Sequence, residues 1–318
     1  MKKILIFGGS GQIGRHLIGR LTKQGYLVTV VTRNLHQKGS ILKTQGNPGY
    51  LNIVEANIFD EKELDKLIKQ HNICINLVGI LFEKKKNSFN NIHINLPNII
   101  SQKCNEHNIE QFIHVSALGI EKAFDSKYAM SKQEGEKKII SNFSKFTILR
   151  PSIIYSVDDN FTTNFMTMLN WLPAFPLYYK GKTKFTPLHV KDLSEIIFEI
   201  IERKLVGKTI ECIGPEVLSF KEIILKLLGS IYKKRILIPI PLTLAKLTAK
   251  FFELMPKPLL TIDQLNLLKY DNVASGKYKT NFDLGLNAYR KFDNEIEKYS
   301  YNWRSGGQFS KKDISNIK

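Results

Sequence analysis

Short apolar runs alternate with segments of helical periodicity along the first half of the chain. The apolar runs cover residues 2–8, 26–33, 51–58, 73–80, 110–118 and 146–155. Helical patterns cover residues 12–25, 60–72, 95–108 and 131–143 between them. Strands and helices that alternate at this spacing form a parallel sheet with helices on both faces. The pattern therefore predicts an α/β, doubly wound parallel sheet.

This alternation ends near residue 155. Residues 158–190 are rich in aromatic residues and prolines, which predicts a substrate-facing segment rather than a regular layer. Residues 191–204 and 207–214 then look like one helix and one strand that return to the sheet, and "SFKE" at 219–222 is a capping box that opens a further helix. We expect one α/β domain over 1–155 and a smaller, mainly helical part over 156–318, from which about 190–214 returns to the sheet.

The composition is that of a globular protein with a basic surface. The net charge is +18, but the lysines are dispersed and no nucleic-acid motif is present, so a solvated surface is favoured and contact with anionic lipid stays open. Cys74, Cys104 and Cys212 show no metal or disulfide spacing. We find no signal-peptide core, transit peptide or membrane span and expect a bacterial-type cytoplasmic protein, with peripheral placement on the inner face of the inner membrane as an option.

The first apolar run leads into a glycine loop, "FGGSGQIGR". Gly8, Gly11 and Gly14 stand three apart, and Gln12, Ile13 and Arg15 complete the loop and the first helical turn. Glycines permit a sharp turn and a close approach of the backbone to a pyrophosphate, and the helix N-terminus attracts its charge. Strand, glycine turn and helix in this order predict a Rossmann-type dinucleotide site with these residues against the cofactor.

The end of the second apolar run bears on which dinucleotide binds. NAD-specific sites place a carboxylate there for the ribose 2′-hydroxyl. This chain has "VVTRN" instead, in which Arg33 is the candidate partner of a 2′-phosphate and Arg15 could assist. The sequence favours NADP(H), with NAD(H) as the alternative.

Ser116, Tyr128 and Lys132 form the candidate catalytic set. Tyr128 and Lys132 are four residues apart and share one face of a helix. A nearby lysine can lower the tyrosine pKa toward neutrality, and a serine at the end of the fifth run can bind a substrate oxygen. The same residues could equally hold a cofactor without catalysis.

These motifs together resemble the extended or atypical short-chain dehydrogenase/reductase superfamily. "NLVGILFE", "FIHVSALG", "SKYAMSKQEGE", "LRPSIIY", "KFTPLHVKDL" and "WRSGGQF" carry the resemblance over nearly the whole chain. They are similar to the branch that contains the nucleotide-binding accessory subunit of mitochondrial respiratory complex I and its alphaproteobacterial relatives. The resemblance implies a Rossmann domain with a smaller C-terminal part, tightly held NADPH and no established turnover.

The resemblance also assigns further residues. It places Gly79 and Pro151 against the cofactor, with Tyr128 and Lys132 beside the nicotinamide half, and it places Asn95 where extended members have an active-site asparagine. Asn57 stands where many relatives have an aspartate that contacts adenine, so that contact is weakened.

Three functions remain open at this point. The first is an NADP(H)-binding protein associated with respiratory complex I or quinone metabolism, whose cofactor is structural or redox-sensing. The second is a free reductase or nucleotide-sugar epimerase or dehydratase that uses Tyr128 as acid/base. The third is a redox-sensing regulator that binds NADP without turnover. No metal site is expected.

Two further features have a structural and a functional interpretation. Residues 236–265 are apolar with interspersed lysines, and Leu244, Leu247, Phe251 and Leu254 fall on one helical stripe, while Lys246, Lys250 and Lys257 supply charge. A helix covering the substrate cleft is the simpler interpretation, and a surface for a membrane or a partner is the alternative. His189 and Asp192 are interpreted as structural.

Overall fold

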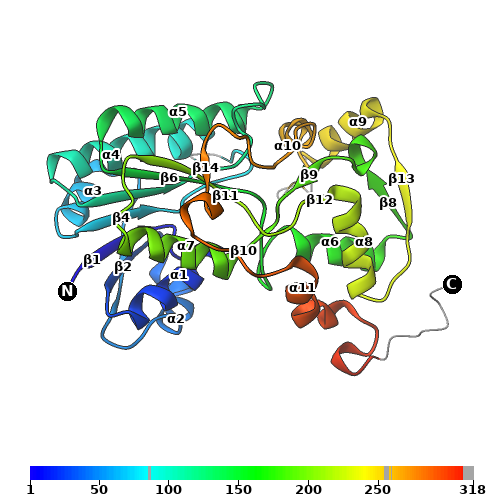
Figure 1. The fold of residues 1–318 in the computed structure, drawn as a ribbon, viewed down its shortest axis with the longest axis horizontal. Helices are drawn as coiled ribbons and strands as arrows, with labels where there is room; N and C mark the ends of the chain where they lie inside the picture. The colour runs from blue at the N-terminus through cyan, green and yellow to red at the C-terminus, as the bar shows by residue number, and fades with distance from the viewer. Residues whose placement is uncertain (85–86, 254–257, 259, 311–318) are drawn as a thin grey trace. The chain divides into compact units, whose positions relative to one another are not determined.

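The computed structural model describes residues 1–84, 87–253, 258 and 260–310 (Figure 1). They form two compact units, each built from several stretches of chain. The first unit comprises Met1–Pro151, Val190–Cys212 and Ala274–Asn287, and the second comprises Ser152–His189, Ile213–Val273 and Ala288 onward. No helix in these described ranges is long and apolar enough to cross a membrane.

The first unit is built on an eight-stranded parallel sheet. Its strands lie in the order β14-β11-β6-β5-β4-β1-β2-β3. They are β1 (Lys3–Phe7), β2 (Leu27–Thr32), β3 (Leu51–Glu55), β4 (Ile73–Asn76), β5 (Gln111–Val115), β6 (Phe146–Pro151), β11 (Lys208–Cys212) and β14 (Lys279–Thr280). The chain proceeds from β1 to one edge and then from β4 to the other. The order therefore reverses between β1 and β4, where ligands of such sheets bind.

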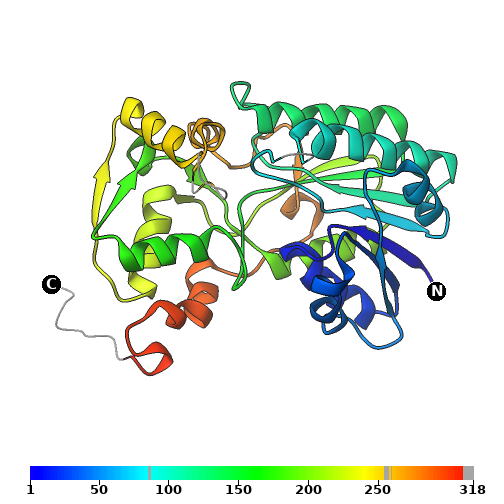
Figure 2. The same ribbon diagram turned by 180° about the vertical axis from the view of Figure 1, so that it is seen from behind.

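Helices cover both faces of this sheet (Figures 1 and 2). They are α1 (Gln12–Lys23), α2 (Leu35–Lys43), α3 (Glu61–Ile68), the π-helical turn η1 (Asn90–Asn95), α4 (Leu96–Glu106), α5 (Lys127–Asn142), α7 (Val190–Glu202) and the 3₁₀ turn η3 (Phe282–Leu284). The α1 and α7 helices pack side by side on one face, and α3, α4 and α5 form the layer on the other. The doubly wound parallel sheet expected from the alternation is confirmed.

The second unit combines helices with three short strand pairs. Its strands are β7 (Ile154–Tyr155), β8 (Ala174–Leu177), β9 (Lys184–Phe185), β10 (Leu188–His189), β12 (Leu218–Ser219) and β13 (Ile236–Pro239). Its helices are α6 (Thr162–Trp171), η2 (Tyr178–Gly181), α8 (Phe220–Ser230), α9 (Leu242–Phe252), α10 (Ile262–Leu267), α11 (Phe292–Ser300), η4 (Tyr301–Trp303) and η5 (Gly307–Phe309). The predicted capping box is present at α8, where the Ser219 and Glu222 side chains accept each other's backbone N–H.

Several elements differ from the sequence expectation. The sixth apolar run is not one strand, because β6 ends at Pro151 and the chain continues into β7 of the second unit. Proline lacks the N–H that a longer ladder would use. The prolines and aromatic residues of 158–190 enclose a regular helix, α6, and not only irregular chain. The sequence pattern does not predict the α2 helix or the two-residue strand β14.

The α5 helix, which carries Tyr128 and Lys132, is tied to the sheet by a buried ion pair. The Arg150 guanidinium on β6 donates two hydrogen bonds to the Glu136 carboxylate, at 3.0 and 2.6 Å. Both side chains are almost fully buried. A pair that is bidentate and buried fixes geometry more strongly than a surface pair. Glu136 therefore holds the helix at a set position on the sheet.

A glycine brings the same helix close to η1. A Cβ atom built on Gly135 would lie 1.8 Å from the carbonyl oxygen of His93. No side chain larger than hydrogen fits at that distance, so the backbone of α5 rests directly against the π-helical turn.

We predict that Glu136→Gln lowers the free energy of unfolding by about 2–3 kcal/mol, because the buried Arg150 charge loses its bidentate partner and keeps the Glu121 carboxylate, 3.3 Å from Nη1, as its remaining counter-ion. Equilibrium urea unfolding followed by circular dichroism measures this. Glu134→Gln on the same helix is the matched control, since Glu134 is half exposed and makes only a 3.5 Å contact with Lys137. Equal losses in the two variants would contradict the prediction.

Candidate functional site

The glycine loop joins β1 to α1 with no room for side chains at two of its positions. Gly8 has a φ of +80°, and a Cβ there would lie 3.0 Å from the backbone of Leu77 and Val78. A Cβ on Gly14 would lie 2.4 Å from the Cα of Gly9, which brings α1 close against the strand end. Both glycines are therefore required by geometry. The N-cap residue of α1 is Gly11, and no side chain in the described part of the chain caps this end of the helix.

The remaining loop residues support this turn. Gln12 and Ile13 are half-buried in the first turn of α1. The Arg15 Nη1 donates a hydrogen bond of 2.7 Å to the carbonyl oxygen of Ser10. Arg15 thus supports the loop backbone. An unblocked helix N-terminus behind a glycine turn suits a pyrophosphate.

The adenosine end of the predicted site lies at the ends of β2 and β3. Arg33 follows β2 and is exposed, and its Nη1 lies 3.3 Å from the Asn87 Oδ1. Asn57 is exposed as well, but its Oδ1 accepts the Phe59 N–H at 3.1 Å, so this oxygen serves the local turn. Glu55, at the end of β3, accepts the Leu35 N–H at 2.9 Å and so engages the start of α2.

Ser116, Lys132 and Gly79 lie at the carboxyl ends of the central strands. Lys132 is buried, and its Nζ donates to the carbonyl oxygen of Val115 at 3.2 Å. A Cβ on Gly79 would lie 3.5 Å from the same Nζ. The Ser116 Oγ is buried and has no hydrogen-bond partner among the described residues. A buried hydroxyl in this state can accept a ligand at little cost.

Burial also changes the protonation of the lysine. Loss of water around the Lys132 ammonium lowers its pKa to about 8, and the Glu136 carboxylate opposes this shift. Lys132 is therefore charged at neutral pH but close to its titration.

His93 lies beside Tyr128, and the sequence analysis did not single it out. Its ring lies edge-on to the Tyr128 ring, with centroids 5.3 Å apart. Its Nε2 accepts the Ile80 N–H at 3.2 Å, so its Nδ1 carries the proton and donates to the Ser131 Oγ at 2.9 Å. Ser131 in turn donates to the Tyr128 carbonyl oxygen at 2.7 Å. This chain of bonds orients the start of α5.

The environment keeps His93 neutral. Burial and the nearby Lys132 charge lower its pKa to about 2. A single histidine in a helical pattern carries no motif, so only the packing of η1 against α5 identifies it. Asn95, which the resemblance placed in the active site, is exposed, and its amide contacts the Asn91 side chain at 3.3 Å.

A second buried histidine lies on β5. The Asn76 amide donates to the His114 Nδ1 at 3.2 Å, so His114 carries its proton on Nε2, which has no partner among the described residues. Burial and the Lys132 charge hold the pKa of His114 well below its usual range. The buried groups around Lys132 are thus polar, and their hydrogen bonding is incomplete among the described residues.

Pro151 and the two residues interpreted as structural are also described, and the Pro151 carbonyl oxygen accepts the Leu118 N–H at 2.9 Å. Pro151 ends β6 in register with Cys212 of β11. His189 lies in the second unit, with its ring 5.1 Å from the ring of Tyr155 and its Nε2 3.8 Å from the Glu295 carboxylate. Asp192 is buried in the first turn of α7.

One surface cluster has the composition of a metal site. Asp65, Glu106 and His107 bring their ligand atoms within 4.8 Å of one another. The Lys103 ammonium lies 2.9 Å from Glu106 and 3.9 Å from Asp65, so a cation already compensates the charge of this cluster.

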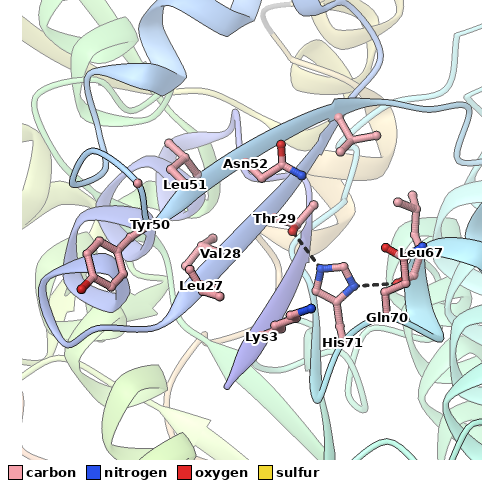
Figure 3. A pocket seen from close by; sticks show the side chains of 12 residues that line it. Lys3, Leu27, Val28, Thr29, Tyr50, Leu51, Asn52, Leu67, Gln70 and His71 are labelled. Carbon is pink, nitrogen blue, oxygen red and sulfur yellow. Dashed lines mark hydrogen bonds between the residues drawn. The ribbon is translucent and has the colours of Figure 1, made fainter. Parts of the chain in front are cut away.

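The cavity in Figure 3 lies at the amino ends of β1, β2 and β3. It measures about 270 Å³ and is lined by residues that begin the strands, such as Lys3, Leu27 and Leu51. His71 contributes its ring, whose nitrogens bond to the Leu67 carbonyl at 2.6 Å and the Thr29 hydroxyl at 2.8 Å. These polar groups are satisfied within the protein, and the cavity belongs to the amino ends of the strands rather than to the candidate site.

The α9 helix in the second unit buries its small apolar side chains and exposes its large ones. Ala245 and Ala249 face inward and are buried. The larger side chains face outward, with exposed fractions of 47% for Leu244, 66% for Leu247 and 68% for Phe251. The predicted stripe therefore faces solvent within this chain. Leu254 and Lys257, predicted to extend it, lie outside the described residues.

The sequence was compared with protein families and with known proteins. The profile of the NAD dependent epimerase/dehydratase family matches residues 4–212. The chain is 30% identical over 284 residues to mouse NADH dehydrogenase [ubiquinone] 1 alpha subcomplex subunit 9, covering 88% of this chain and 75% of that protein. It is 25% identical over 283 residues to the 40 kDa subunit of Neurospora crassa NADH-ubiquinone oxidoreductase, covering 88% and 74%.

Solved structures agree on the fold. The dTDP-glucose 4,6-dehydratase DesIV of Streptomyces venezuelae, solved with NAD bound, superposes with a TM-score of 0.69 at 16% identity, over 95% of this chain and 96% of that one. The glycine loop, the parallel sheet and the family profile lead to one conclusion: the chain belongs to the NAD dependent epimerase/dehydratase family.

Proposed function

We propose that this protein binds NADP(H) and associates with respiratory complex I, with the cofactor in a structural or redox-sensing role. The observation that carries the cofactor part is the unblocked amino end of α1 behind Gly8 and Gly14, with the buried Lys132 ammonium in the same unit. The partner part rests on similarity to complex I subunits over 88% of the chain.

The charge at the end of β2 supports NADP(H) over NAD(H). Arg33 is exposed there, and a guanidinium binds a phosphate dianion well. The Glu55 carboxylate lies at the end of β3 rather than β2, and one of its oxygens accepts the Leu35 N–H at 2.9 Å. A 2′-phosphate would therefore meet a cation at this position.

The burial of the Lys132 ammonium supports the binding of a ligand that compensates its charge. An ammonium taken from water weakens the fold unless something compensates. A pyridine nucleotide carries anionic phosphates and ribose hydroxyls, which can supply that compensation. Catalysis is not required to explain why the lysine is present.

The specific observation that favours an enzyme is the buried Ser116 Oγ, which no described residue hydrogen-bonds. With Tyr128 and Lys132 intact, the site retains a hydroxyl for a substrate oxygen, an acid/base and a cation. The second candidate function is accordingly an NAD(P)-dependent reductase or epimerase in which Tyr128 transfers the proton.

The α9 surface supports peripheral contact with an anionic membrane. Lys246 and Lys250 are exposed beside the stripe of Leu244, Leu247 and Phe251. An apolar stripe can enter the interface while lysines meet lipid phosphates, at about 1 kcal/mol for each basic residue close to the surface.

The proposal is tested by purifying tagged protein from gently solubilised native membranes and identifying the chains that accompany it. We expect complex I subunits with both the wild type and Tyr128→Phe, and equal NADPH binding by both, because the tyrosine hydroxyl is not needed for a held cofactor. Recovery of no complex I subunit, together with a turnover that Tyr128→Phe abolishes, would instead establish the enzyme.

Membrane contact predicts flotation with phosphatidylcholine vesicles that contain phosphatidylglycerol. Replacing Leu247 and Phe251 by serine should abolish flotation, because it removes the two most exposed apolar side chains of α9. Leu225→Ser on α8 is the matched control, since Leu225 is also exposed. Wild-type protein that remains with the unbound fraction at low salt would refute the membrane proposal.

The lowered pKa of Lys132 predicts that the stability of the protein depends on pH. The folded pKa of this lysine, about 8, lies below the ordinary 10.5, so between these values the unfolded chain binds a proton that the folded chain lacks. The free energy of unfolding of cofactor-free protein should therefore rise over this range, by at most about 1.4 kcal/mol per pH unit from this group. Below pH 8 the full cost of burying the charge remains.

Lys132→Met should remove that rise, whereas Lys137→Met, an exposed lysine on the same helix, should keep it. Urea unfolding at several pH values between 8 and 10.5 measures the difference. An identical pH profile in the two variants would show that Lys132 is not buried as a charged group.

A further inference from the structure

Arg33 contacts a distant segment of the chain at the end of β2. Its Nη1 donates to the Asn87 Oδ1 at 3.3 Å, across 54 positions of sequence. Asn87 lies in the connection between β4 and η1. Lys84 and Asn87 face each other there, and each donates its backbone N–H to the other's carbonyl oxygen at 3.0 Å. These reciprocal bonds place the Asn87 amide beside the Arg33 guanidinium.

The base of this connection is anchored beside Tyr128. The Glu83 carboxylate accepts the Phe89 N–H at 2.7 Å. The buried Phe89 ring stacks on His93 at 5.3 Å and lies edge-on to Tyr128 at 6.0 Å. Since the base packs against the core, the position of Asn87 is set by folded structure. One connection thus contacts both the arginine and the tyrosine of the candidate site.

The contact orients the guanidinium without consuming its charge. An amide oxygen accepts one of the five N–H donors of arginine and leaves the others for an anion. The amide is neutral, so the positive charge of Arg33 is retained. Lys84 is exposed on the same connection and adds a second cation. These groups suit a phosphate dianion and offer little to an unphosphorylated ribose.

We propose that Asn87 is a specificity-determining positioning residue: it orients Arg33 toward the 2′-phosphate of NADP(H), and Lys84 supplies a second charge. The inference rests on the proposed function, because it assumes that the nucleotide of this site carries that phosphate.

The test is the ratio of the NADH and NADPH dissociation constants, measured by calorimetry on the full chain at one fixed ionic strength. Asn87→Asp keeps the size of the side chain but pairs Arg33 with a carboxylate and repels the phosphate. We expect it to reduce the preference for NADPH by about tenfold or more, with NADH binding unchanged. Asn105→Asp, an exposed site on α4 with the same change of charge, should leave the ratio unaltered.

Three further variants separate the ways in which the proposal can fail. Arg33→Ala should reduce the preference more than Asn87→Ala, and Lys84→Ala should weaken the dependence of NADPH binding on salt. A ratio that falls in Arg33→Ala but not in Asn87→Asp overturns the role of Asn87 alone. A ratio unchanged in Arg33→Ala overturns the NADP(H) preference, and this inference with it.

Discussion

The buried pair of Glu136 and Arg150 is the interaction on which the candidate site most depends. It fixes α5 on β6, and α5 carries both Tyr128 and Lys132. The close approach at Gly135 sets the distance of this helix from η1, and the bonds from His93 through Ser131 set its first turn. Tyr128 and Lys132 are therefore positioned by residues of two other elements, the strand β6 and the π-helical turn η1.

The candidate site contains buried polar groups whose hydrogen bonding is incomplete. The buried Ser116 Oγ and His114 Nε2 have no partners among the described residues, and the Lys132 charge lies in the same region with its pKa lowered. Unsatisfied buried groups weaken a fold, so positions that retain them often serve function. Polar ligand atoms could complete these bonds. This is consistent with a cofactor that contributes to the stability of the protein as well as to its chemistry.

Much of the fold could be predicted because parallel strands buried on both faces appear as continuous apolar runs, and glycine turns mark the start of α1. Contacts between the elements could not be predicted from the sequence. His93 lies beside Tyr128 only because η1 packs on α5, and Asn87 meets Arg33 only through the connection after β4. Helix α2 lacked a strong apolar pattern, and β14 is two residues long. Hydrophobic periodicity could not predict the orientation of α9 either, because alanines pack inward and the larger apolar side chains face outward.

The two units interleave along the chain, and this has a consequence for biosynthesis. The sheet of the first unit receives β11 after the chain has passed once through the second unit, and β14 after it has passed through that unit twice. A nascent chain emerging from the ribosome therefore presents β6 as an unprotected edge until residues 208–212 follow, and the β11 edge stays open until residues 279–280. Open edges invite non-native pairing. The first unit, although its first strand begins at Lys3, cannot complete its sheet until residues 279–280 have been translated.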